Sequence, residues 1–165
     1  MRRSWTFTIT SEIPAPPERV WARVVTPEGI NHEMRPWMTM SMPPGARGMT
    51  IDSIPVGTGQ PVGRAWIRLF GLVPFDFDHL VIARLEPGRR FVEESTMASM
   101  RRWGHDRTVA PGRAASSSQV TDVVTLEPRA PLRVAGPLLR RVLGAFFAHR
   151  HRRLAAYFAD SRGEP

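Results

Sequence analysis

The sequence contains no cysteine and no lysine among its 165 residues. Without cysteine the chain cannot form disulfides, supply a thiol nucleophile or bind zinc through thiolates. The lack of disulfides is typical of a cytoplasmic protein, and we expect that location. No apolar run has the length of a signal-peptide core or of a membrane span, so neither of these is predicted.

The basic residues are all arginine, and 23 of them against 15 acidic residues give a net charge of +8. Eight arginines and two acidic residues lie in residues 129–165, which predicts a basic surface over the C-terminal region. Neither basic-aromatic alternation of the RNP kind nor a helix-turn-helix pattern accompanies this charge. We therefore interpret it as a solvated helix face and expect no nucleic-acid partner. Contact of this arginine face with nucleic acid or another acidic partner is kept as an alternative.

The composition, 42% apolar and 23% charged residues, is that of a globular protein large enough to bury a core. No internal repeat interrupts the chain, so we predict a single domain over residues 1–165. The sequence leaves open whether this domain is a monomer or a homodimer.

The first third of the chain predicts one strand and two short helices. Residues 5–10 alternate large apolar and polar side chains, the pattern of a half-buried strand. The proline-rich residues 13–17 end that strand and begin a helix whose apolar face includes Val20 and Trp21. Thr26 followed by a proline is typical of a helix N-cap, and we expect a second short helix through about Met34.

The middle of the chain predicts antiparallel strands separated by proline and glycine turns. Short spacings between the apolar segments favour meander connections over helical crossovers. The expected strands are residues 37–42, 63–70, 77–85, 90–97, 100–109 and 119–126. Residues 45–62 hold either another edge strand, near residues 49–54, or a long loop over one end of the sheet.

A long C-terminal helix is predicted at about residues 138–159, where no proline interrupts the chain. At 100° per residue, Arg150 falls in the middle of an apolar stripe that also contains Leu143, Phe146 and Leu154. Because a guanidinium keeps its charge, this position predicts either a buried ion pair or a polar cavity.

The order of these elements resembles the helix-grip fold of the START-like SRPBCC superfamily, the Bet v 1-like group that includes polyketide cyclases/dehydrases and lipid-transfer proteins. Four local segments resemble the corresponding parts of that superfamily: Ile13-Pro-Ala-Pro-Pro-Glu-Arg-Val-Trp21, Trp103-Gly-His105-Asp-Arg107, Thr121-Asp122-Val-Val and Phe146-x-x-x-Arg150. The resemblance implies an α+β fold in which a curved antiparallel sheet is wrapped around the long C-terminal helix, with two short helices after the first strand. It also implies a cavity between sheet and helix that binds a small hydrophobic or amphipathic molecule, without a cofactor.

Asp122 is the expected partner of Arg150. It shares a strand face with Val120, Val124 and Leu126, so a carboxylate would enter the interior that Arg150 faces. We predict that the pair clasps the last strand to the last helix, and a contact of both residues with the ligand is the alternative.

Glu93, His105 and Arg107 are candidate catalytic residues for an alternative function. A polyketide cyclase or aromatase-like enzyme, acting as a lyase or isomerase, would use His105 or Glu93 as base and an arginine to stabilise an enolate. An exposed cross-strand ladder of ion pairs explains the same residues without catalysis, and we favour that interpretation. We therefore lean toward a binding protein over an enzyme.

No metal site is predicted. His149 and His151 point 200° apart on a helix, and no HExxH, P-loop, GxGxxG or GxSxG pattern is present. The residues expected to line the ligand cavity are mostly large, and several are methionine or aromatic side chains that adapt to varied apolar ligands. They are Trp37, Met40, Trp66, Phe70, Phe77, Met97, Trp103, Asp122, Phe146 and Arg150.

Overall fold

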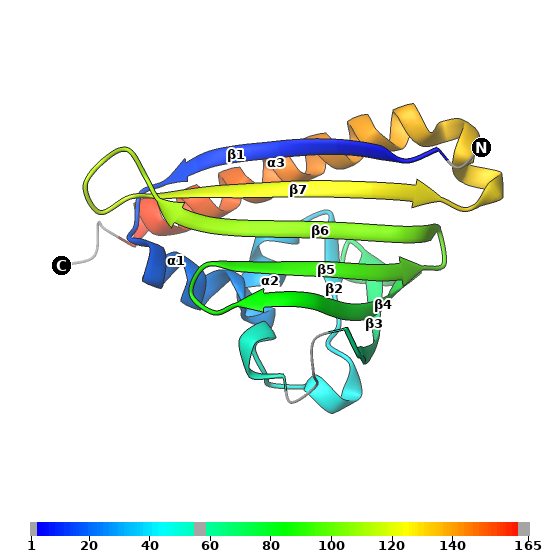
Figure 1. The fold of residues 1–165 in the computed structure, drawn as a ribbon, viewed down its shortest axis with the longest axis horizontal. Coiled ribbons are helices and arrows are strands. Elements are labelled where there is room, and N and C mark those ends of the chain that lie inside the picture. The colour runs from blue at the N-terminus through cyan, green and yellow to red at the C-terminus, as the bar shows by residue number, and fades with distance from the viewer. Residues whose placement is uncertain (1–2, 55–58, 162–165) are drawn as a thin grey trace.

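A curved antiparallel sheet packs against one long helix in the computed structural model, which describes residues 3–54 and 59–161 (Figure 1). The elements, in chain order, are β1 (Trp5–Ile13), α1 (Pro17–Val24), α2 (Pro27–Met34), β2 (Met38–Met40), η1 (Pro44–Ala46), η2 (Ile51–Ser53), β3 (Pro61–Leu69), β4 (Val73–Glu86), β5 (Arg90–Met97), β6 (Met100–Pro111), β7 (Ser118–Pro128), η3 (Ala130–Ala135) and α3 (Gly136–Asp160), where η marks a short 3-10 turn.

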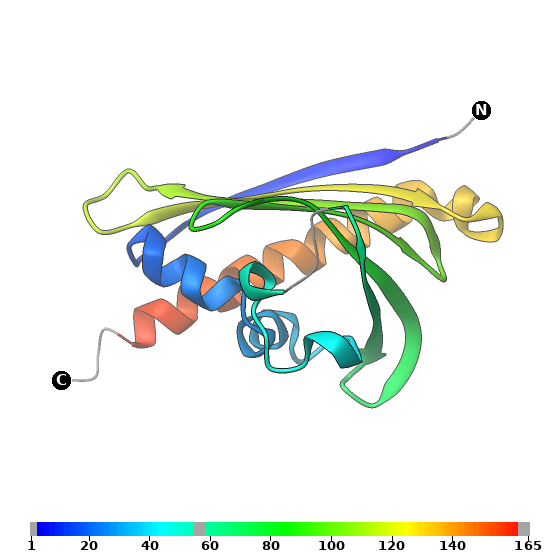
Figure 2. The same ribbon diagram turned by 60° about the horizontal axis from the view of Figure 1, so that its bottom comes forward.

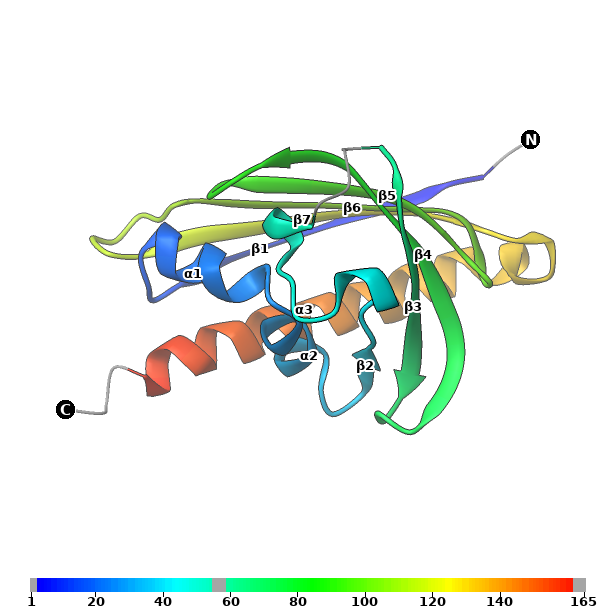
Figure 3. The same cartoon turned by 90° about the horizontal axis from the view of Figure 1, so that it is seen from below.

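The seven described strands form one sheet in the order β1-β7-β6-β5-β4-β3-β2, and every neighbouring pair is antiparallel. Figures 2 and 3 show β3 and β4 bending away from the plane of β1, β7 and β6, toward the side on which the helices lie. The sheet therefore curls around α3, and the predicted helix-grip α+β fold is confirmed.

The strand boundaries follow the predicted alternation closely where one face is buried. The strand expected at residues 90–97 is β5 without change, whereas β2 contains only three of the six residues expected at 37–42. The possible edge strand at residues 49–54 is not a strand, because the short turn η2 (Ile51–Ser53) occupies this segment. Residues 55–58 of the predicted loop at 45–62 lie outside the described residues.

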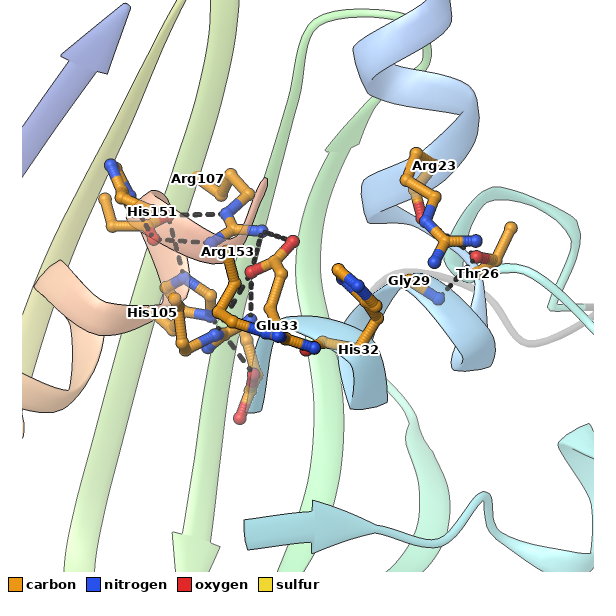
Figure 4. Close-up of polar contacts among 12 residues, drawn as sticks. Arg23, Thr26, Gly29, His32, Glu33, His105, Arg107, His151 and Arg153 are labelled. Carbon is orange, nitrogen blue, oxygen red and sulfur yellow. Dashed lines mark hydrogen bonds and ion pairs between the residues drawn. The ribbon is translucent and has the colours of Figure 1, made fainter. Parts of the chain in front are cut away.

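Thr26 makes the corner between α1 and α2. Its hydroxyl accepts a hydrogen bond from the Gly29 backbone N–H at 3.0 Å and donates one to the Arg23 carbonyl at 2.8 Å (Figure 4). A side chain at Gly29 would place its Cβ 1.9 Å from that same carbonyl oxygen. The predicted N-cap therefore forms, and it brings the two helices so close that only glycine fits at this position.

The face of α3 that packs against the sheet is rotated from the predicted stripe. The buried side chains of α3 centre on Phe147, His151, Leu154 and Phe158, whereas Phe146 at one edge of the predicted stripe is only half-buried. The predicted stripe borders an internal cavity, described below, and its Leu139, Leu143 and Phe146 are only partly buried against the core.

Gly29→Ala should destabilise the protein by about 1–3 kcal/mol, because the added methyl group meets backbone that cannot move without opening the corner. Urea denaturation checks this expectation. Gly144→Ala in α3 is the matched control: its nearest foreign atom would lie 3.9 Å away, so helix propensity should stabilise this variant by about 0.5–1 kcal/mol. Equal free energies of unfolding for the two variants would contradict the steric account of Gly29.

Candidate functional site

Arg107 is the centre of a buried ionic network between the sheet and the helices. Its Nε and Nη2 donate to the two oxygens of Asp122 at 2.7 and 2.6 Å, and its Nη1 donates to both oxygens of Glu33 at 2.9 Å (Figure 4). Arg107, Asp122 and Glu33 are completely buried. The guanidinium on β6 thus joins a carboxylate of β7 to a carboxylate of α2.

Arg150 is paired with Glu33 and not with Asp122, so the predicted Arg150–Asp122 pair is wrong. The Arg150 Nη2 lies 3.0 Å from Glu33 Oε2, and its Nε donates to the same oxygen at 3.1 Å. The reason is that α2 places Glu33 within reach of the long helix, while the Asp122 carboxylate is already occupied by Arg107. A clasp between α3 and β7 exists, but His151 forms it, with Nε2 2.9 Å from Asp122 Oδ2.

The network keeps its carboxylates ionised in spite of burial. Burial alone would raise the pKa of Asp122, but Arg107 and His105 outweigh it and hold that pKa well below its ordinary value. Burial likewise opposes ionisation of Glu33, and the charges of Arg107 and Arg150 still bring its pKa below the ordinary value. Two carboxylates and two guanidinium groups therefore balance one another inside the protein.

A cavity of about 500 Å³ lies between the sheet, α2 and α3, directly beside this network. Its wall comes from β2 to β6, from both short helices and from α3, and nearly all of the lining is apolar. Six of the eight methionines in the sequence line it, namely Met34, Met38, Met40, Met42, Met97 and Met100. A cavity of this size accommodates a small organic molecule.

The cavity reaches the surface near the turn between β3 and β4 and the N-terminal half of α3. Phe75 on β4 and Val142 on α3 both line it, and more than half of each side chain is exposed to solvent. Leu132 in η3 lines it as well and is also exposed. The apolar lining therefore continues outward as an apolar mouth.

Five of the ten predicted ligand-binding residues line the cavity: Met40, Met97, Trp103, Phe146 and Arg150. Asp122 does not, because it is buried beneath the wall in the ionic network. Whether the lining residues contact a ligand stays a prediction.

Four predicted aromatic residues do not line the cavity: Trp66 and Phe77 were assigned to the wrong face of their strands, and Trp37 and Phe70 lie in turns just outside β2 and β3. Trp66 packs edge-on against Phe77 with ring centroids 5.8 Å apart, and Trp66 is exposed. The inward residues of β3 are the alternate ones, the buried Ala65 and the cavity-lining Ile67. Trp37 and Phe70 are also exposed and contact each other, with ring centroids 6.2 Å apart.

The three candidate catalytic residues are buried, so the favoured interpretation of a surface ladder is wrong. Glu93 and His105 line the cavity, and Arg107 lies behind them in the network. An ion pair between neighbouring strands does lie on the outer face of the sheet. It is formed by Glu94, the residue after Glu93, whose two carboxylate oxygens accept hydrogen bonds of 2.8 Å from Arg102. Strand alternation brings one set of charges inward and leaves the other in solvent.

His105 has a fixed orientation at the cavity wall. Its Nε2 lies 3.0 Å from Asp122 Oδ1, and its Nδ1 lies 3.9 Å from Glu93 Oε2. Because Asp122 is ionised and can only accept, the Nε2 carries the proton and Nδ1 keeps a lone pair directed toward Glu93. Burial lowers the pKa of His105, which favours this neutral imidazole.

Sequence reasoning missed Glu33 and Asp78, two buried acids of this region. Glu33 shares a face of α2 with the apolar Ile30, which is the same signal that singled out Arg150 on α3. Asp78 shares the inward face of β4 with the buried Leu80 and Ile82, and it lines the cavity. In both cases a charged residue in an apolar pattern was the available signal.

Two general features of the described residues bear on the site. None of their helices is long and apolar enough to cross a membrane. Within the same residues, no group of three or more histidine, aspartate or glutamate side chains has the arrangement of a metal site.

Comparison with known proteins places the chain in a structural class. A family model described as a domain of unknown function, DUF8410, matches residues 11–158. A START superfamily protein from Mycobacterium smegmatis is 11% identical over 94% of this chain and 97% of its own, with a TM-score of 0.67. A protein from Chromobacterium violaceum is 15% identical over 93% and 96%, also with a TM-score of 0.67.

A third structure, DynU16 of the dynemicin biosynthetic locus, is 20% identical over 90% of this chain and 46% of its own, with a TM-score of 0.55. No curated protein matches the chain. At these identities the likeness concerns the fold, which is START-like as the sequence resemblance predicted.

Arg107→Met should destabilise the protein by about 3–5 kcal/mol at neutral pH, because it leaves two buried carboxylates without their shared cation. Arg102→Met on the outer face of the same strand is the control and should cost no more than about 1 kcal/mol. Urea denaturation measures both variants.

The deficit of Arg107→Met should shrink in acid. The lowered pKa values of Asp122 and Glu33 stabilise the wild type above the ordinary carboxyl values of 3.8 and 4.5, and this contribution is lost progressively as the pH falls below these values toward the lower native ones. A deficit independent of pH would show that Arg107 stabilises by packing alone.

Proposed function

The chain belongs to the DUF8410 family of domains of unknown function, and from its START-like fold and its cavity we propose that it binds a small hydrophobic or amphipathic molecule between the sheet and α3. The observation that carries the proposal is an apolar internal space of about 500 Å³ in a domain of this size. Packed protein interiors leave few voids larger than a water molecule, so a space of this volume indicates a site for a bound molecule.

The chemistry of the lining supports an apolar ligand of adaptable shape. Methionine side chains contribute from β2, α2 and both ends of the β5–β6 turn, and their flexible thioethers adjust to different outlines. The exposed apolar mouth at Phe75 and Val142 gives such a ligand a path from the surface. The ionic network closes the opposite wall, where Arg150 lines the cavity.

Leu143→Trp should weaken binding of the neutral dye Nile red by about tenfold or more, because the larger side chain fills part of the cavity. Leu138→Trp, five residues earlier on α3, is the matched control: Leu138 is 62% exposed and lies outside the lining. Dye fluorescence titration gives both affinities, and thermal denaturation checks that both variants fold. If Nile red does not bind the wild type, or binds both variants as well as the wild type, the binding proposal fails.

A second candidate function is acid-base catalysis on the bound molecule, as in a polyketide cyclase or aromatase-like enzyme. The observation that favours it is the orientation of His105, whose Nδ1 lone pair is directed toward Glu93 in the cavity wall while Asp122 holds Nε2. His105 would remove a proton from the carbon next to a carbonyl group, and the electron pair would move onto the carbonyl oxygen, which the Glu93 carboxyl group would protonate.

Deuterium exchange at the α-carbons of 2-octanone in D2O tests this second function. The wild type should exchange at least about a hundredfold faster than His105→Asn. His149→Asn, which replaces a histidine of α3 that hydrogen-bonds only a backbone carbonyl, should exchange like the wild type. Equal rates for the wild type, His105→Asn and buffer would exclude enolisation of this ketone by the site.

A further inference from the structure

Asp78 and Glu93 form a carboxyl pair in the cavity wall. They stand on the neighbouring strands β4 and β5, are 2% and 8% exposed, and both line the cavity. Each side chain influences the ionisation of the other, and Ser95, whose hydroxyl accepts from the Val81 backbone N–H at 3.1 Å, lies beside both. Two buried carboxyl groups in such proximity oppose each other's ionisation, which favours a proton held between them over two negative charges.

No cation in the described residues is salt-bridged to this pair except for a long contact with His105. The Arg107 guanidinium is paired with Glu33 and Asp122, and the Arg150 guanidinium is paired with Glu33. His105 is 3.9 Å from Glu93, and burial lowers its pKa, which disfavours the charged imidazolium. The negative charge of Asp78 and Glu93 therefore lacks the compensation that the ionic network has.

Two oxygens of the pair, Asp78 Oδ1 and Glu93 Oε1, receive no hydrogen bond from any other group in residues 3–54 and 59–161. Buried carboxyl oxygens without a donor are costly in an apolar environment. Burial accordingly raises the pKa of Glu93 well above its ordinary value, with the Asp78 charge as the next cause, and burial also raises the pKa of Asp78.

The other charged groups near the pair do not supply its missing partner. Asp76, two residues before Asp78 on β4, adds negative charge. Its own carboxylate accepts hydrogen bonds from the Ser99 side chain and from the backbone N–H groups of Phe77 and Ser99. His79 is the next residue of β4 and lies on the opposite face of the strand, half-exposed. The cavity wall at β4 and β5 is thus an acceptor-rich, negatively charged spot in an otherwise apolar lining.

From this geometry we propose that the cavity selects an amphipathic amine, whose protonated amino group binds between Asp78 and Glu93 while its apolar part lies among the methionines. A primary ammonium carries three N–H donors and one positive charge, which are the two things that the pair lacks. This inference rests on the proposed binding function and specifies the ligand's polar end.

The test compares octylamine, 1-octanol and octanoate, which share a chain and differ in the charge of the polar end. Isothermal titration calorimetry at neutral pH should show octylamine binding at least about tenfold more tightly than either of the others. In the double variant Asp78→Asn/Glu93→Gln, octylamine should lose at least about tenfold in affinity, while 1-octanol should change by less than about threefold.

Glu94→Gln is the matched control, because Glu94 is the next residue of β5, faces outward and pairs with Arg102. This variant should keep the preference for octylamine, which excludes a general effect of net charge. If 1-octanol or octanoate binds the wild type as well as octylamine does, the amine proposal is wrong and the binding function stands. If Nile red and all three octyl compounds fail to bind, the binding function itself is wrong.

Discussion

The burial of Arg107 between Glu33 and Asp122 constrains most of this structure. A guanidinium that cannot lose its charge requires acceptors on every side, and here they come from β7 on one side and α2 on the other. Arg150 then anchors α3 to the same Glu33, and His151 anchors it to Asp122. Two elements far apart in the sequence are thereby held at a fixed distance from the sheet, and the cavity is the space that this distance leaves.

The structure separates two kinds of buried charge. Glu33 and Asp122 are compensated by arginines, which lower their pKa values, and removing a cation there would cost stability. Asp78 and Glu93 are buried without such compensation, and their pKa values are raised. The first kind holds the fold together. The second kind leaves carboxyl oxygens at the cavity wall without a hydrogen-bond donor or a cation. Buried groups with strongly perturbed pKa values cluster at functional sites, which agrees with the ligand site proposed above.

Much of the fold was predictable because it depends on local patterns. The alternation in β1 and β5, the Thr26 corner and the long C-terminal helix each follow from a few adjacent residues. The site was less predictable. Arg150 was recognisable as a buried charge, but the sequence could not tell Asp122 from Glu33 as its partner, since that depends on where α2 lies. The Trp66 strand has large apolar side chains on both faces, so its inward face was ambiguous until the curl of the sheet was known.

The long helix α3 has two halves with different surroundings. From Phe147 to Phe158 its inner side chains are buried and tied to the sheet and α2, whereas Leu139, Val142 and Leu143 border the cavity and Leu138 and Val142 are exposed. Local opening costs least where few apolar contacts are broken. The N-terminal half is nevertheless held to β1, because the Arg140 Nε donates to the Thr6 carbonyl at 2.9 Å, the Trp5 ring covers Gly136, and Leu139 and Leu143 pack against the core around Phe7. Widening of the mouth at Val142 would therefore break contacts between α3 and β1, and it would leave the ion pairs of Arg150 and His151 at the other end of the helix in place.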